Sequence, residues 1–97
     1  MATYVVLGDF TEQGIKNVKK TAIRAEEFRQ MAIKHGAVLK ETFWTLGACD
    51  IVQIVEAPDE MAMTALSLSL GALGFARTQT LRAFSETEMK SILTRMA

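Results

Sequence analysis

The sequence is poor in the residues that cross-link or interrupt small proteins, because its 97 residues include one cysteine and one proline. A lone cysteine excludes an internal disulfide framework and fits a reducing compartment, so we expect a cytoplasmic protein. No apolar run approaches the roughly 20 residues that a membrane-spanning helix needs. The opening MATYVVLGDF also lacks the basic segment of a signal peptide, so no membrane association is predicted.

An excess of charge of either sign is missing as well. Lysine plus arginine and aspartate plus glutamate number eleven each. Such a balance provides no basic field for a phosphate backbone, so nucleic acid is not an expected partner. Histidine occurs only as His35, and the carboxylates are scattered without the spacing of metal ligands. The sequence therefore predicts no metal, no cofactor and no catalytic set of residues.

What the sequence does contain is enough apolar material for one core, since 49% of its residues are hydrophobic. We expect a single domain over residues 1–97. Alternating and continuous apolar patterns predict strands at 3–10, 37–46, 50–57 and 75–84. Helical spacing predicts helices at 11–35, 59–74 and from 85 onwards, the first with a kink or break within 19–22.

The predicted helix ends carry recognisable signals. Thr11 is the N-cap candidate of the first helix, with Asp9 as a second candidate, and Gly36 follows its last turn. Glycines 71 and 74 are expected to end the second helix. The sequence SETE, with Ser85 followed three residues later by Glu88, is a capping box that begins the last helix.

The order β-α-β-β-α-β with a C-terminal helix is that of a ferredoxin-like α+β domain. It predicts a four-stranded antiparallel sheet with the helices on one face, because right-handed crossovers put them there. The first and third strands lie in the middle, and TYVVLGDF and DIVQIVEA are the stretches with apolar residues at both odd and even positions. The second face then needs a cover, and we expect another subunit to provide it. Candidate partner-facing residues are Val5, Val6, Val52 and Ile54.

A short hairpin joins the second and third strands through the segment GACD. Gly47 suits a positive φ, and Asp50 can accept hydrogen bonds from turn amides. Cys49 lies beside that carboxylate, with no cation nearby and no second cysteine. Those surroundings do not favour a thiolate, so we interpret Cys49 as a turn residue and not as a nucleophile.

Three stretches, YVVLGDFTEQGI, LGACDIVQIVEAPD and ALGFARTQTLRAFSE, together resemble the GYD domain family along nearly the whole chain. The family is named for a hairpin motif written G-x-Y-D in many members. Gly47 and Asp50 match it, and Cys49 stands where the tyrosine would be. The resemblance implies a ferredoxin-like fold of the dimeric α/β-barrel kind and assigns no biochemical activity.

Six other side chains are candidates for a pocket or an interface. Trp44, on an outer strand, either covers a helix edge or anchors a partner. Arginines on the fourth strand are suited to a carboxylate, either of a ligand or of Glu41 or Glu56 in another subunit. His35 falls in the last turn of a helix, where capping or solvent exposure is favoured over a role as a base. The six candidates are Tyr4, His35, Trp44, Arg77, Gln79 and Arg82.

The sequence leaves two classes of function open. The favoured one is a homo-oligomeric binding or assembly module, with sensing of a small molecule as a further role. The alternative is a small cofactor-free enzyme, resembling a monooxygenase or an isomerase. Such an enzyme needs an enclosed pocket between sheet and helices, with His35, Tyr4, Trp44 or an arginine pointing in.

Overall fold

The structure is a computed structural model that describes all residues from 1 to 97. The predicted order of elements is confirmed, and so is the break within the first helical segment. The strands are β1 (Ala2–Phe10), β2 (Val38–Trp44), β3 (Ile51–Ala57) and β4 (Ala76–Ala83). The helices are α1 (Glu12–Lys16), the 3-10 helix η1 (Val18–Lys20), α2 (Thr21–Lys34), α3 (Glu60–Ala72) and α4 (Glu86–Thr94). None of these helices is both long enough and apolar enough to cross a membrane.

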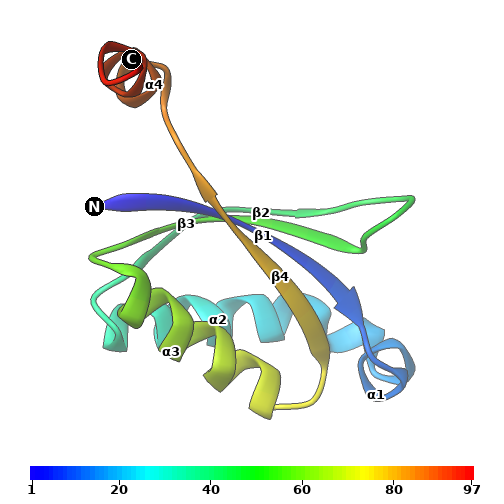
Figure 1. Ribbon diagram of the computed structural model, residues 1–97. Coiled ribbons are helices and arrows are strands. Elements are labelled where there is room, and N and C mark those ends of the chain that lie inside the picture. The colour runs from blue at the N-terminus through cyan, green and yellow to red at the C-terminus, as the bar shows by residue number, and fades with distance from the viewer.

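The four strands form one antiparallel sheet in the order β2-β3-β1-β4. β1 and β3 are therefore central, as predicted from their apolar residues at both parities. α2 and α3 lie side by side on one face of this sheet (Figure 1). The register of β2 shifts between Leu39, opposite Val55, and Glu41, opposite Ile54, so that Lys40 forms a bulge on this edge strand.

The helix ends follow the local signals of the sequence. The side chain of Thr11 accepts a hydrogen bond from the Gly14 amide at 3.0 Å, and Asp59 accepts one from the Ala62 amide at 2.8 Å. Ser85 and Glu88 form the predicted capping box of α4. Gly36 and Gly74 follow α2 and α3 with φ of 71° and 84°. Gly71, by contrast, lies inside α3, so the expectation that it ends the helix was wrong.

The core lies between the sheet and the two helices. Tyr4, Val6 and Val55 project from the central strands toward α2 and α3 and are buried there. They meet apolar side chains of both helices, namely Phe28 and Ala32 of α2 and Met63 and Leu66 of α3. Val6 is only 2% exposed, so it is a core residue and its place among the partner-facing candidates was wrong.

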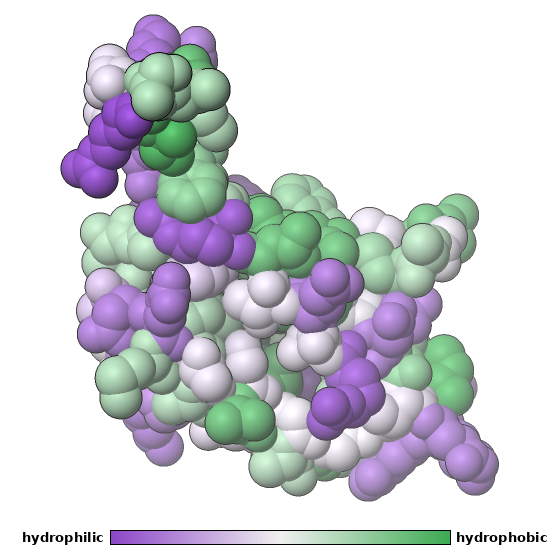
Figure 2. Space-filling view, viewed as in Figure 1, coloured by the Kyte–Doolittle hydropathy of each residue, from purple (hydrophilic) through white to green (hydrophobic).

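The opposite side of the sheet carries a second set of apolar side chains, which we call the open face. Successive residues of a strand point to opposite sides, so the neighbours of the core residues belong to this side. In register, Val5 stands between Ile54 and Leu81, and Leu7 stands beside Val52. Figure 2 shows apolar surface on this side, between α4 and the β2–β3 hairpin. The open face consists of Val5, Leu7, Phe43, Val52, Ile54 and Leu81.

The C-terminal helix stands away from the rest of the domain. β4 leads it to the side of the sheet opposite α2 and α3 (Figure 1). α4 has no buried residue, and the apolar side chains Met89, Ile92 and Leu93 are exposed on it. An ion pair between Arg82 and Glu88, 3.1 Å apart, ties its first turn to β4. The amphipathic helix thus lacks a partner for its apolar face within its own chain.

Replacing Gly47 by valine tests the hairpin. Gly47 has a φ of 111°, which side chains other than glycine rarely adopt, and a Cβ there would meet no atom within 4 Å. The expected loss is therefore due to backbone strain alone, about 1–3 kcal/mol in the free energy of unfolding. Chemical denaturation measures it. The matched control is Ala48→Val in the same exposed loop, where φ is not positive. Equal stability of the two variants would contradict the assigned backbone conformation.

Candidate functional site

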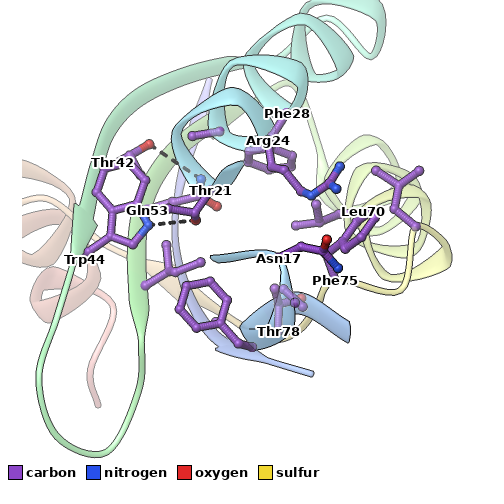
Figure 3. Close-up of a pocket in the computed structure, with 17 residues that line it drawn as sticks. Asn17, Thr21, Arg24, Phe28, Thr42, Trp44, Gln53, Leu70, Phe75 and Thr78 are labelled. Carbon is purple, nitrogen blue, oxygen red and sulfur yellow. Dashed lines mark hydrogen bonds between the residues drawn. The ribbon is translucent and has the colours of Figure 1, made fainter. Parts of the chain in front are cut away.

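A cavity of about 60 Å³ lies between the helix-covered side of the sheet and the start of α2 (Figure 3). Because a buried water needs about 10–15 Å³ of such space, this cavity has room for a few waters or a small ligand. Gly14 of α1 and Asn17, which follows α1, border it at one end, and the end of α3 borders it at another. It is more enclosed than the grooves beside Arg77, beside Phe84 and beside Arg82, and it remains open to solvent on one side.

The chain folds around this cavity for local reasons. The break before Thr21 starts α2 anew, so that residues 21, 24, 25 and 28 point into the cavity at the i, i+3, i+4, i+7 spacing of one helix face. The strands contribute alternate residues of their helix-covered side. Gly14 closes the end near α1, because a Cβ there would lie 1.9 Å from the Phe75 carbonyl oxygen. Glycine is therefore needed at position 14 for α1 to pack against the α3–β4 connection.

Most of the cavity wall is apolar. Aromatic rings come from the end of β1, from α2 and from the segment before β4, and aliphatic side chains come from β3 and the end of α3. These side chains provide dispersion contacts but no hydrogen bonds, so they suit the hydrocarbon part of a ligand. The apolar side chains are Phe10, Phe28, Ile51, Leu70, Leu73 and Phe75.

The polar groups are few and well placed. Arg24 of α2 lies over the ring of Phe75, with its guanidinium carbon 3.3 Å from the ring centroid. The indole nitrogen of Trp44 donates a hydrogen bond to the Thr21 hydroxyl at 3.0 Å. Gln53 is only 6% exposed and donates one long hydrogen bond, 3.5 Å, to the Thr42 hydroxyl. Asn17 and Thr78 complete the polar lining (Figure 3).

Of the six sequence candidates, the structure places only Trp44 at this cavity. Its bond to Thr21 shows that the indole covers the edge of α2, which was one of the two predicted roles. His35 is the C-cap residue of α2, and its amide donates a hydrogen bond to the Ala32 carbonyl at 3.0 Å. Gln79 is opposite Leu7, on the side of the open face. Arg77 lines a separate groove beside Gly71 of α3.

Tyr4 and Arg82 come together elsewhere, at the edge of the sheet below α4. The guanidinium carbon of Arg82 lies 5.8 Å from the Tyr4 ring centroid and 4.5 Å from that of Phe84. The Tyr4 hydroxyl is buried without a hydrogen-bond partner. A hydrogen bond from the Ser85 amide, and a second one from Arg82, lower the pKa of Glu88. The carboxylate that Arg82 meets thus belongs to its own chain.

The hairpin motif serves the fold directly. Asp50 accepts a hydrogen bond from the Phe10 amide at 2.9 Å, forty positions away, and not from the turn amides that we expected. Its own amide donates to the Gly8 carbonyl at 2.9 Å, so Asp50 fastens the start of β3 to the end of β1. Cys49 is half-buried, with its sulfur 3.6 Å from the Thr45 hydroxyl. Its neighbourhood is that of a loop residue.

Sequence reasoning missed the main polar residues of the cavity, Arg24 and Gln53. One signal for Gln53 was visible, because it is the polar interruption of the otherwise apolar stretch IVQIV. A polar residue at a helix-covered position of a central strand implies a polar neighbour inside. Arg24 had a weaker signal, since it lies four residues before Phe28 on the apolar face of α2. Neither signal identifies the cavity without the tertiary packing.

The fold defines a ferredoxin-like α+β protein with a small cavity under its sheet. A model of the GYD domain matches residues 4–93, so the chain belongs to the GYD domain family. The chain is also similar to a protein of Thermus thermophilus named glutamine synthetase and cystathionine beta-lyase binding protein. The two are 29% identical over 90 residues, which cover 92% of this chain and 95% of that protein. No solved structure matches the chain.

Replacing Asp50 by alanine tests its role in the fold. The change leaves the Phe10 amide without its partner, and a hydrogen bond to a charged group contributes about 1.5–3 kcal/mol. We expect a loss of that order in the free energy of unfolding, measured by urea titration. Cys49→Ser is the control from the same motif and should stay within about 0.5 kcal/mol of the unmodified protein. A larger effect at Cys49 than at Asp50 would reverse the assignment.

Proposed function

We propose that this protein is a homodimeric binding module in which two sheets pack face to face, and that the assembled module binds a second protein. The observation that carries the proposal is the open face of the sheet. Its side chains come from all four strands, and no helix of the chain packs on this side as α2 and α3 do on the other (Figure 1). A contiguous set of apolar side chains that no element of the chain covers is typical of an interface.

A second copy of the same chain fits this face for two reasons. Sheets that pack face to face bury both inner surfaces, and a two-fold axis lets one apolar surface match itself. α4 adds an exposed apolar stripe on the same side of the molecule (Figure 1). In a face-to-face dimer this helix is in reach of the partner subunit, where Met89, Ile92 and Leu93 become covered.

The role in binding other proteins rests on the relative from Thermus thermophilus, whose name says that it binds glutamine synthetase and cystathionine beta-lyase. The similarity extends over nearly the full length of both chains. We therefore extend a protein-binding role to this chain, with these two enzymes as the first partners to test. A cytoplasmic location is part of the proposal, because the single unpaired Cys49 suits a reducing compartment.

A small cofactor-free enzyme is the second candidate, and the cavity is the observation that favours it. Trp44 and an arginine, Arg24, line this partly open cavity between sheet and helices, whereas His35 and Tyr4 do not. The lining offers hydrogen-bond donors, acceptors and one fixed positive charge. A binding module releases its ligand unchanged, whereas an enzyme releases a product, so the chemical identity of the released molecule distinguishes the two candidates.

The dimer is tested by replacing Ile54 with lysine. Ile54 lies in the middle of the open face, opposite Val5, and a buried unpaired ammonium there disfavours association strongly. Sedimentation equilibrium should give twice the chain mass for the unmodified protein and the chain mass for the variant. Leu68→Lys, on the exposed side of α3, is the control and should remain dimeric. An unmodified protein with the mass of one chain at micromolar concentration would disprove the dimer.

The protein partner is tested with purified glutamine synthetase and cystathionine beta-lyase from the organism that encodes this chain. Biolayer interferometry with the immobilised protein should give saturable binding of at least one of them. An unrelated enzyme of similar size is the negative control. If neither enzyme binds the dimeric protein, the transfer of partners from the relative fails, while the dimer itself is judged separately by sedimentation.

A further inference from the structure

We propose that the cavity beside α2 is a binding site for a small apolar carboxylate, such as a short branched-chain acid. This site goes beyond the binding of protein partners and does not depend on the dimer, because it lies on the helix-covered side of the sheet (Figure 3). The inference combines three properties of the lining: its single charge, a buried amide with unused hydrogen-bonding capacity, and the apolar side chains around them.

Arg24 is the only charged residue among those that line the cavity. Its side chain is 28% exposed, and its one carboxylate partner, Glu27, is 3.8 Å away and itself half exposed. Such a long, solvent-exposed pair contributes little to stability and leaves guanidinium donors free. The guanidinium stacks on the ring of Phe75, and this contact holds it in place. Arg24 is therefore oriented to meet an anion, and a planar carboxylate matches its donors.

Gln53 supplies the second element. A primary amide offers two donors and an acceptor with two lone pairs, and the 3.5 Å contact with Thr42 uses one donor weakly. Because this side chain is more than nine-tenths buried, its remaining capacity points to a partner inside the cavity. Figure 3 shows Gln53 and Trp44 on one side of the hollow, with Arg24 and Phe75 on the other. A ligand between them can use both polar sides.

The apolar side chains of the lining indicate what the uncharged part of the ligand is. Phe10, Phe28 and Leu70 give contacts that suit a branched aliphatic group. The cavity of about 60 Å³ has room for about four to six water-sized groups and is open to solvent on one side. A branched acid with five carbons has seven non-hydrogen atoms, so it fills the cavity and extends into this opening. No carboxylate lines the cavity, so a zwitterionic amino acid would bury its ammonium without a counter-charge. The lining thus favours a simple acid over the corresponding amino acid.

Titration with isovalerate, followed by nuclear magnetic resonance, tests the site. Trp44 is the only tryptophan, so its indole N–H signal reports the cavity without ambiguity. We expect a saturable shift of this signal with isovalerate. Isovaleramide, which has the same shape without the charge, should bind at least about ten-fold more weakly, since a hydrogen bond between charged groups contributes about 1.5–3 kcal/mol. Leucine should be weaker than isovalerate as well.

Substitutions test whether Arg24 is the residue that binds the carboxylate of the ligand. Arg24→Met keeps an apolar stem over Phe75 and should weaken isovalerate binding about ten-fold, because the same charged hydrogen bond is lost. Arg77→Met makes the identical change outside the cavity and should bind like the unmodified protein. If Arg24→Met does not fold, Ala25→Met, which fills the cavity from the next position, should fold and abolish the shift.

Four results would overturn the assignment. They are the absence of a saturable shift in the unmodified protein, equal affinity for acid and amide, leucine binding as tightly as isovalerate, and full binding by a folded Arg24→Met or Ala25→Met variant.

Discussion

The central strands β1 and β3 carry apolar side chains on both sides, but the chain packs helices on one side only, and the remaining architecture follows from this imbalance. α2 and α3 cover the core-facing side chains Tyr4, Val6 and Val55. Val5 and Ile54, one residue away along the same strands, face the other side. Burying apolar surface is favourable by about 25 cal/mol per Å². Because the chain alone leaves the open face exposed, this free energy is gained only on association. α4 lies on that same side, and its apolar stripe is likewise exposed.

The cavity arises from a second departure from a filled core. Where Gln53 stands on β3, an aliphatic residue would extend the packing of Val55 and Ala57 on the same side of that strand. The amide and the guanidinium of Arg24 keep this end of the core polar and partly empty. The cost is lost packing, which a domain of this size tolerates because the other end of the core is closed by Leu66 and its neighbours. Gly14 then lets α1 approach the Phe75 carbonyl and close the end of the hollow.

Local signals in the sequence predicted the fold well because they act over a few residues. Thr11 and Ser85 bond to amides three residues away, and the break before Thr21 follows an interruption of the apolar stripe. Contacts between distant segments could not be predicted in this way. Asp50 was expected to serve its own turn and instead binds the Phe10 amide on another strand. The cavity depends on α1, α2 and the α3–β4 connection meeting in space, so the candidates chosen by residue type included Trp44 but missed Arg24.

β3 is the element that relates the two proposed binding surfaces. Along this strand Val52 and Ile54 belong to the open face, while Ile51 and Gln53 line the cavity. Adjacent residues of a strand point to opposite sides, so β3 contributes to both surfaces without sharing a side chain between them. The bond from the Phe10 amide to Asp50 fastens β3 to β1 and holds the register in which the two central strands present both sets of side chains.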